Sequence, residues 1–469
     1  MRLSFEEIVR AVDGSAVAGA APCGIVEGVG TDSRAVKPGS LFVCIPGETF
    51  DGHDFAVKAI EAGAAALLVS RNPFDAVPPV PLILVEDTVK ALGKLAHCWR
   101  ERLGETRVIG LTGTAGKTTV KELLAQVLSR RGLTAKTHMN LNNQIGLPLS
   151  MLAATGEEAF WVMEAGISHP NDMDELGAIL EPDLAHVGPG HAAGLGDRGT
   201  AHYKSKLLAH LAPGGTAIIS ADYPDLAREA RAVRQELVFF STSGRQVDYR
   251  AAYVVPAGED KGLFRLWLDG VSIDVEAPFR GAFGAENVIA VAAVAHRLGL
   301  GAEEIAAGFA GAALPKQRFA CSRAGDWLVI DDSYNANPLS FSRMLEAAAE
   351  MAGDHADRPL VCVLGEMGEL GSLSEDEHRN LGRLVADIKP RLVCWKGGHL
   401  EEFEDGLHAG RYGGAFCPVT SAEDMFKGLA ACDLGSGGGV ILFKGSRSNK
   451  LETLVSAFTE AQAGEPHAV

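Results

Sequence analysis

A glycine-rich turn between an apolar run and a helical pattern carries the clearest chemistry in the sequence. Residues 108–119 read Val-Ile-Gly-Leu-Thr-Gly-Thr-Ala-Gly-Lys-Thr-Thr, and apolar residues recur at helical spacing through residue 128. The backbone N–H groups of such a turn and the positive end of the following helix bind phosphate. A lysine in this position reaches the distal phosphates, and a threonine hydroxyl beside it holds Mg²⁺. The stretch therefore predicts a nucleoside triphosphate site.

The turn departs from the general phosphate-loop pattern at one position. That pattern has a glycine five residues before Gly116, where this sequence has Leu111, and the extra glycine here is Gly113. An ordinary glycine-rich turn is the alternative, and Gly-Lys-Thr-Thr at the head of a good helix disfavours it. The residues expected at the nucleotide are Gly113, Thr114, Ala115, Gly116, Lys117, Thr118 and Thr119.

Further along the chain, polar residues that could bind a metal follow two predicted strands. The apolar strand 160–164 ends on Glu164, at the sheet edge where the phosphate turn would lie and where Mg²⁺ needs a carboxylate. A helix cap or a surface glutamate is the alternative. His191 follows the short strand 183–187, and Lys204 stands on a predicted helix with Lys206 close by. Isolated histidines and lysines are more often structural or solvent-facing, so the residues alone leave these roles open.

Strands and helices alternate along the whole chain, which predicts an α/β fold of three domains. We expect a small α/β domain at 1–103, a central P-loop mononucleotide-binding domain with a parallel sheet at 104–314, and a Rossmann-like domain at 315–469. The central part includes a predicted hairpin around Asp269-Gly270. No Gly-x-Gly-x-x-Gly motif stands at the first strand of the third domain, so a dinucleotide site is not expected there.

Three polar segments next to predicted strands are further candidates for ligand contacts. Thr-Asp-Ser-Arg at 31–34 lies in the first domain, and Asp-Asp-Ser-Tyr-Asn-Ala-Asn-Pro at 331–338 lies in the third. Lys-Gly-Ser-Arg at 444–447 places two cations at a strand end, where they would suit carboxylate or phosphate. For the segment at 31–34, turn and capping chemistry is an equally good interpretation.

The composition limits the function classes. The 469 residues carry 43 Lys and Arg against 60 Asp and Glu, a net charge of −17, which argues against non-specific nucleic-acid binding. The sequence has no run of eighteen apolar residues, so we expect no membrane insertion. Its eight cysteines form no Cys-x-x-Cys and mostly lie in apolar runs, as expected of buried, reduced thiols in a cytoplasmic protein.

Taken together, these segments resemble the Mur ligases of bacterial peptidoglycan synthesis over nearly the whole chain. The segments that carry the resemblance are 31–34, 51–54, 113–119, 142–146, 331–338, 364–371 and 444–447. Those at 331–338 and 444–447 resemble most the members that join D-Ala-D-Ala to UDP-N-acetylmuramoyl-tripeptide. The Asp-Asn-Pro-Arg motif of the ligase that adds the preceding diamino acid is absent. The family's phosphate loop also lacks the first glycine.

The resemblance implies a UDP-substrate-binding first domain, a central ATP-binding domain and a C-terminal ligase domain that recognises the incoming amine. It implies ATP and two Mg²⁺ sites, with UDP-N-acetylmuramoyl-tripeptide and D-Ala-D-Ala as substrates, and we expect a monomer. Catalysis would fall to Lys117, Glu164, His191 and a carbamylated Lys204, the last three binding metal together with Thr118. Further nucleotide contacts would be Asn287, Arg318 and Asp332. Substrate contacts would be Ser33, Arg34, Asn142, Asn143, Asn335, Asn337, Lys444 and Arg447.

Several positions differ from the usual residues of the family. Ala115 and His186 stand where Asn is usual, Phe283-Gly284 replaces His-Asn, Lys206 stands where Glu is frequent, and Glu366 replaces Asp. The replacement at 206 leaves open whether Lys204 or Lys206 is the modified lysine. Two alternatives remain: another ligase of this type with a different amino acid, and a nucleotide-binding relative without catalysis. The segment at 331–338 argues against the first, and the retained catalytic set argues against the second.

Overall fold

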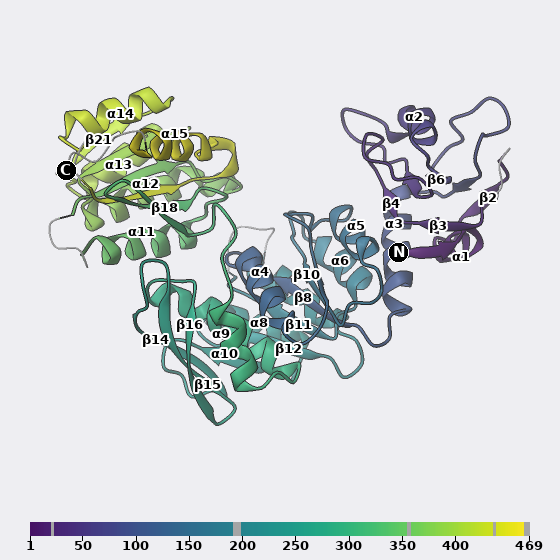
Figure 1. The fold of residues 1–469 in the computed structure, drawn as a ribbon, viewed down its shortest axis with the longest axis horizontal. Helices are drawn as coiled ribbons and strands as arrows, with labels where there is room; N and C mark the ends of the chain where they lie inside the picture. The colour runs from purple at the N-terminus through teal and green to yellow at the C-terminus, as the bar shows by residue number, and fades with distance from the viewer. Residues whose placement is uncertain (20–22, 191–197, 354–357, 435–437, 464–469) are drawn as a thin grey trace. The chain divides into compact units, whose positions relative to one another are not determined.

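The structure is a computed structural model that describes residues 1–19, 23–190, 198–353, 358–434 and 438–463. Its residues form two compact units, Met1–Phe239 and Phe240–Val469. Strands and helices alternate through both units (Figure 1), which confirms the predicted α/β class. The two units do not divide the chain at the expected domain boundaries, and the three-domain division stays a prediction.

The first sheet of unit 1 is small and mostly parallel. Its strand order is β2-β7-β6-β5-β4, and only β2 and β7 pair antiparallel. A short antiparallel ribbon of β1 and β3, which the sequence did not predict, stands beside it. The bounds are β1 (Arg2–Ser4), α1 (Phe5–Ala11), β2 (Ser15–Val17), β3 (Ile25–Glu27), β4 (Val29–Gly30), β5 (Leu41–Val43), the 3₁₀ turn Gly52–Phe55, α2 (Ala56–Glu61), β6 (Ala66–Val69), β7 (Leu82–Leu84) and α3 (Thr88–Glu101).

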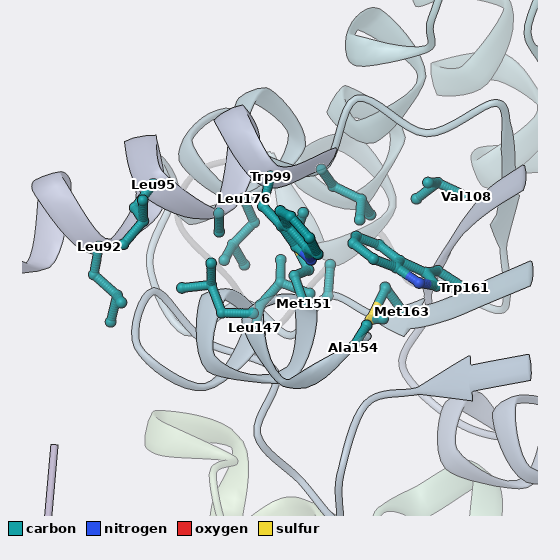
Figure 2. Packing of buried hydrophobic residues seen from close by; sticks show 14 of the residues in the cluster. Leu92, Leu95, Trp99, Val108, Leu147, Met151, Ala154, Trp161, Met163 and Leu176 are labelled. Atoms are coloured by element: carbon teal, nitrogen blue, oxygen red, sulfur yellow. The ribbon is translucent and has the colours of Figure 1, made fainter. Parts of the chain in front are cut away.

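Helix α3 attaches this first sheet to the rest of unit 1. Its apolar face packs on α5 (Gly146–Ala153) and α6 (Asp172–Leu180). Gly93 allows the close approach, because a Cβ there would lie 2.8 Å from Cδ1 of Ile179. The buried side chains of this contact include Leu92, Leu95, Trp99, Leu147, Met151 and Leu176 (Figure 2). One continuous core therefore joins the first sheet to the central one.

The central sheet of unit 1 is parallel, with strand order β12-β11-β8-β10-β9. The strands that follow β8 in the chain lie on both of its sides, with β10 and β9 on one side and β11 and β12 on the other. The carboxyl end of β8 is therefore a topological switch point, the usual place for a ligand in such sheets. The bounds are β8 (Arg107–Thr112), α4 (Lys117–Leu128), β9 (Thr134–Lys136), β10 (Phe160–Glu164), β11 (Leu184–Val187), α7 (Gly199–Ser205), the 3₁₀ turn Lys206–His210, β12 (Thr216–Ser220) and α8 (Pro224–Val233).

Unit 2 contains an antiparallel meander of β14 (Tyr249–Pro256), β15 (Gly262–Leu268) and β16 (Val271–Ala277). Strand β13 (Val238–Ser241) spans the boundary of the units and pairs parallel with β14. A hairpin joins β15 to β16. Asp269 and Gly270 at its turn both have positive φ, 48° and 90°, as two-residue hairpins favour. This confirms the predicted hairpin. The helices of this part are α9 (Ala285–Arg297) and α10 (Ala302–Ala310).

The second sheet of unit 2 has the order β17-β18-β22-β19-β20-β21, parallel except for β17. The bounds are β17 (Ala320–Ala324), β18 (Trp327–Asp332), α11 (Pro338–Gly353), β19 (Leu360–Gly365), the 3₁₀ turn Gly371–Leu373, α12 (Ser374–Ile388), β20 (Leu392–Lys396), α13 (Leu400–Ala409), β21 (Ala415–Pro418), α14 (Ala422–Ala431), β22 (Val440–Lys444), the 3₁₀ turn Arg447–Asn449 and α15 (Glu452–Ala463). The segments at 331–338 and 444–447 follow adjacent strands of this sheet.

All eight cysteines are free thiols. Cys44, Cys362 and Cys394 are buried and the other five are half-buried, so the expectation of buried thiols holds for three of them. Among the described residues, no helix has both the length and the apolar character needed to cross a membrane.

Candidate active site

The phosphate turn is the four-residue connection 113–116 between β8 and α4. Gly116, the residue before the helix, has a φ of 80°, and Gly113 has a φ of 154°. A Cβ on Gly113 would lie 3.0 Å from Cα of Gly188, so only glycine fits against that neighbouring backbone. The ammonium of Lys117 donates to the carbonyl oxygen of Gly113 at 2.7 Å, across the mouth of the turn. The turn therefore has the glycine-built backbone and the cation of a phosphate cradle.

The missing first glycine has a structural reason. Leu111 is fully buried inside β8, where it pairs with Glu164 on one side and His186 on the other. The turn begins only two residues later, at Gly113. Position 111 lies inside the strand and not in the turn, so its backbone does not need glycine. The buried leucine side chain packs in the core against the sheet.

The carboxylate of Glu164 lies at the head of the same helix. Glu164 is 2% exposed at the last position of β10. Its Oε2 accepts from the hydroxyl of Thr118 at 3.1 Å and lies 3.7 Å from Nζ of Lys121, and its Oε1 accepts from Nδ2 of Asn142 at 2.8 Å. The structure thus brings Thr118, Glu164 and Asn142 together.

These oxygen atoms fit a magnesium ion. Mg²⁺ prefers one or two carboxylates together with hydroxyl, water and phosphate oxygens. Glu164 offers the carboxylate and Thr118 the hydroxyl next to the phosphate turn. Within the ranges that the structure describes, no group of three or more His, Cys, Asp or Glu side chains is arranged as a metal site. The expected ligand His191 lies outside those ranges.

Lys204 and Lys206 have different surroundings. Lys204, on α7, is 5% exposed. Lys206 is in the following 3₁₀ turn, and its ammonium contacts the carboxylate of Asp174 at 2.6 Å. A hydroxyl contact at 3.4 Å between Thr114 and Thr200 connects the phosphate turn to the helix that carries Lys204. These positions favour Lys204 over Lys206 as the lysine of the site.

His186 occupies the interior of β11. It is 4% exposed, and its Nδ1 lies 3.3 Å from the carbonyl oxygen of Ile218 on the neighbouring strand. Burial lowers the pKa of His186 to about 4, so the ring is neutral at physiological pH. This histidine therefore supports the sheet behind the site as an uncharged hydrogen-bonding group.

The expected substrate contacts of unit 1 are placed at the surface. Ser33 is half-buried, and the exposed guanidinium of Arg34 binds the Asp32 carboxylate through Nε at 2.9 Å and Nη2 at 2.7 Å. This contact lowers the pKa of Asp32 to about 2. The Oδ1 of exposed Asn143 accepts from the backbone N–H of Gly146 at 2.9 Å. Asn143 thus supports the first turn of α5.

In unit 2, Lys444 and Asp332 form a buried ion pair. Lys444 is fully buried, its Nζ lies 2.5 Å from Oδ2 of Asp332, and it also donates to the carbonyl oxygen of Asn335 at 3.3 Å. The other carboxylate oxygen accepts from the backbone N–H of Phe319 at 3.1 Å. Burial lowers the pKa of Lys444, and Asp332 opposes that shift. The pair connects the segment at 331–338 to the one at 444–447.

Tyr334 lies between two expected ligand-binding arginines. The Arg318 guanidinium carbon is 4.3 Å from the centre of its ring and that of Arg447 is 5.8 Å away. Such contacts hold a guanidinium in place while leaving its edge able to bind an anion. Asn337 has a capping geometry, because its Oδ1 accepts from the N–H of Ser340 at 2.9 Å at the start of α11. The remaining expected contacts are exposed Asn335 and half-buried Asn287.

The sequence alone did not single out Lys121 or Tyr334. Lys121 is fully buried and donates to the carbonyl oxygen of Met139 at 2.7 Å, so it connects α4 to the loop that holds Asn142. Its position four residues after Lys117, on the same face of a helix, was the available signal. For Tyr334, the signal was an aromatic residue inside an otherwise polar loop.

Comparisons with known proteins agree with these observations. Three family profiles match: "Mur ligase family, catalytic domain" at residues 25–100, "Mur ligase middle domain" at 111–295 and "Mur ligase, glutamate ligase domain" at 317–447. The UDP-N-acetylmuramoyl-tripeptide–D-alanyl-D-alanine ligase of Escherichia coli K12 is 35% identical over 445 residues, 93% of this chain and 94% of that protein.

Solved structures show the same similarity. A crystal structure of MurF from Acinetobacter baumannii matches 98% of this chain and 99% of its own with a TM-score of 0.87 and 29% identity. MurF from Thermotoga maritima in complex with ADP matches 93% and 98% with a TM-score of 0.80 and 27% identity. These matches confirm the resemblance seen in the motifs. This chain belongs to the Mur ligase family.

Proposed function

We propose that the chain is an ATP-dependent ligase that joins D-Ala-D-Ala to UDP-N-acetylmuramoyl-tripeptide, with release of ADP and phosphate. The observation that carries the proposal is the meeting of the glycine-built phosphate turn with the contact between Thr118 and the buried carboxylate of Glu164. The relative from Escherichia coli, 35% identical over nearly the full length, bears the name of this activity. The resemblance at 331–338 and 444–447 supports the same acceptor.

Each part of the chain has a proposed task. Residues 1–103 bind the UDP end of the substrate through Ser33 and Arg34, residues 104–314 bind ATP, and residues 315–469 bind the incoming dipeptide. The proposed dipeptide and peptide contacts are Asn142, Asn143, Asn335, Asn337, Lys444 and Arg447. Further nucleotide contacts are Asn287, Arg318 and Asp332. The ion pair of Asp332 with Lys444 and the contact of Arg318 with the Tyr334 ring support these assignments by holding both side chains in fixed positions.

The first step is transfer of the γ-phosphoryl group of ATP to the terminal carboxylate of the tripeptide. The N-terminus of α4 and the ammonium of Lys117 face the phosphates and offset the charge that develops on the transferred group, whereas the Thr114 N–H of the turn donates to the carbonyl oxygen of Pro189. Thr118 and Glu164 would hold a Mg²⁺ at this site, where the ion would supply positive charge against the phosphate oxygens.

The second step is attack of the dipeptide amine on the acyl phosphate, which releases phosphate and forms the new amide. The acyl phosphate hydrolyses if water reaches it, so the residues around the site must exclude water until the amine arrives. The carboxylate of the dipeptide suits the guanidinium of Arg447, because a planar guanidinium binds a carboxylate through two hydrogen bonds. ATP and UDP-linked precursors are cytoplasmic, so we place the reaction in the cytoplasm.

A second Mg²⁺ completes the proposal, with His191 and carbamylated Lys204 as ligands. Carbamylation adds CO₂ to the neutral amine of lysine and yields an anion that can bind a metal. The burial of Lys204 supports this assignment, because the modification needs an uncharged amine away from bulk water.

A phosphate-release assay tests the proposed function. The enzyme is supplied with ATP, Mg²⁺ and UDP-N-acetylmuramoyl-tripeptide, and acceptors are added one at a time: D-Ala-D-Ala, single amino acids and glutamate on a folate-like acceptor. Phosphate release that depends on D-Ala-D-Ala supports the proposal. Release only with another amino acid identifies a different ligase of the family, and no release with any acceptor identifies a relative without catalysis.

A further inference from the structure

His378 is a buried histidine whose two ring nitrogens have fixed and opposite roles. It is fully buried in the second turn of α12. Its Nε2 accepts from the backbone N–H of Met367 at 2.9 Å, and its Nδ1 lies 2.6 Å from the carbonyl oxygen of Ser374. An N–H only donates and a carbonyl only accepts, so the ring must be neutral with its proton on Nδ1. A protonated ring would turn a second N–H towards Met367 and lose that hydrogen bond.

The surroundings of the ring keep it neutral. His399 stacks on it at 4.4 Å between ring centres, and Trp395 meets it edge-on at 5.8 Å. Burial lowers the pKa of His378, the hydrogen bond to the Ser374 carbonyl raises it, His399 lowers it, and Glu366 and Glu402 raise it. The three side chains that act on the ring are Glu366 in the loop after β19, His399 just before α13 and Glu402 in the first turn of α13. The net shift leaves His378 unprotonated at neutral pH.

The hydrogen bond to Met367 fixes the loop 366–370, which follows β19 and belongs to one of the segments that carry the family resemblance. On its other side this loop is bound to the Lys-Gly-Ser-Arg segment. The Gly368 N–H donates to Oγ of Ser446 at 2.6 Å, and the Ser446 N–H donates to the carbonyl oxygen of Glu366 at 3.0 Å. Asn449 Nδ2 donates to the same carbonyl at 3.0 Å. The loop therefore lies between the buried imidazole and the segment that supplies Lys444 and Arg447.

Little free space separates the two loops. A Cβ on Gly445 would lie 3.0 Å from Cα of Gly365, so the backbones are in direct contact. The carboxylate of Glu366 accepts from the N–H of Gly398 at 2.7 Å, which fixes the loop from a third direction. A displacement of the Met367 peptide would therefore move Ser446 and the segment around it.

We propose that His378 is a positioning residue for acceptor recognition, which acts by holding the Met367 peptide and, through Ser446, the Lys-Gly-Ser-Arg segment. The inference rests on the proposed function, because it takes Lys444 and Arg447 as contacts of the dipeptide acceptor. His378 itself touches no substrate. Its neutral Nδ1–H form is the active form.

Two substitutions separate the acceptor role of Nε2 from the bulk of the ring. His378→Phe keeps an aromatic ring and removes the acceptor, whereas the side-chain oxygen of His378→Gln can accept from Met367. We expect His378→Phe to raise KM for D-Ala-D-Ala about ten-fold, as for one buried hydrogen bond left unmade, with KM for the UDP-tripeptide unchanged. His378→Gln should stay near the wild type. His399→Phe keeps an aromatic ring on the stacked neighbour but also removes its contacts with the Ser374 hydroxyl and the Glu402 carboxylate, so it tests the contribution of His399 separately.

The pH profile is a second readout of the same role. In the wild type, KM for D-Ala-D-Ala should rise only when the pH falls through the lowered pKa of His378, below the ordinary histidine value of 6.5, and in His378→Gln this rise should be absent. Equal profiles in the two proteins, or equal KM values in the wild type and His378→Phe, would overturn the proposal.

A nitrogen-15 spectrum of the histidine rings tests the tautomer without any catalysis. In full-length protein labelled at histidine, one of the Nδ1–H ring signals should disappear in His378→Gln, while those of other rings such as His53 remain. A signal of the Nε2–H form at this residue would refute the inference even in an active ligase. An Nδ1–H signal in a protein with no ligase activity would instead mean that the proposed function had failed while the local geometry was right.

Discussion

The hydroxyl of Thr118 lies 3.1 Å from Oε2 of Glu164, so the first turn of α4 and the end of β10 present two oxygen atoms at one point. They are 46 residues apart in the chain, and the parallel pairing of β8 with β10 brings them together. The phosphate turn begins at the carboxyl end of the paired strand β8. This meeting of a phosphate cradle with a carboxylate is the core of the proposed phosphoryl-transfer site.

Glu164→Gln should abolish magnesium-dependent turnover. The amide keeps the shape and the contact with Thr118 but removes the charge that holds the ion, and we expect a loss of about 100-fold or more in kcat. Substrate-dependent ADP formation at several Mg²⁺ concentrations measures this. Glu122→Gln is the control, since Glu122 is a neighbouring carboxylate that contacts Lys121 and Lys136 outside the proposed ligand set. Equal activity of Glu164→Gln and the wild type would remove Glu164 from the metal site.

Lys117→Ala should remove ADP formation that depends on both substrates. The ammonium is the cation of the phosphate turn, and its loss leaves the transferred charge without a partner, at a cost of about 100-fold or more in kcat. Lys58→Ala, an exposed lysine on α2, serves as the control. If Lys117→Ala retained turnover, the phosphate role of this lysine would be wrong.

Lys204 and Lys206 should respond differently to carbon dioxide. Activity of the wild type should fall when bicarbonate is removed and return when it is restored. Lys204→Ala should be inactive with or without bicarbonate, whereas Lys206→Ala, which loses the ion pair with Asp174, should keep the bicarbonate response. The reverse pattern would assign the modification to Lys206.

Asp332→Asn should destabilise the protein strongly. The substitution leaves the buried ammonium of Lys444 without its carboxylate, which costs about 3–5 kcal/mol in comparable cases. Urea unfolding of Asp332→Asn, Lys444→Met and the double variant measures the coupling. A double variant more stable than Asp332→Asn confirms that the unpaired charge is the cause, and three equal losses would refute it.

The stability of the wild type should fall in mild acid through His186. Its pKa is about 4 in the folded chain against an ordinary 6.5, so below pH 6.5 the unfolded chain binds the proton more readily. The folded state therefore loses about 3 kcal/mol from this group between pH 6.5 and 4. His186→Asn should lose less stability over that range in thermal unfolding. Parallel pH dependence of the two proteins would show that His186 binds the proton equally in the folded and unfolded chains.

Much of unit 1 could be predicted from the sequence because its signals are local. The apolar run 160–164 is a buried parallel strand ending on Glu164, as predicted, and the turn at 113–116 precedes a helix with a clear apolar face. Pairing between strands that are distant in the chain leaves no local signal in the sequence. The β1–β3 ribbon pairs strands of three residues each, too short to carry a pattern.

The burial of charged groups could not be predicted. Lysine is usually exposed, so nothing in the spacing announced that Lys121 and Lys444 are fully buried or that Lys204 is more buried than Lys206. Burial of each depends on residues far away in the sequence, as with Lys444 and Asp332, which are 112 residues apart. The tautomer of His378, by contrast, depends on partners only 4 and 11 residues away, Ser374 and Met367.

Isotope transfer tests the central claim of an acyl-phosphate ligase most directly. UDP-N-acetylmuramoyl-tripeptide labelled with ¹⁸O in its terminal carboxylate is incubated with ATP, Mg²⁺ and D-Ala-D-Ala, and the released phosphate and the peptide product are analysed by mass spectrometry. The account predicts one ¹⁸O atom in each phosphate and a product extended by D-Ala-D-Ala. Phosphate without ¹⁸O, or labelled phosphate with no extended product, would contradict it.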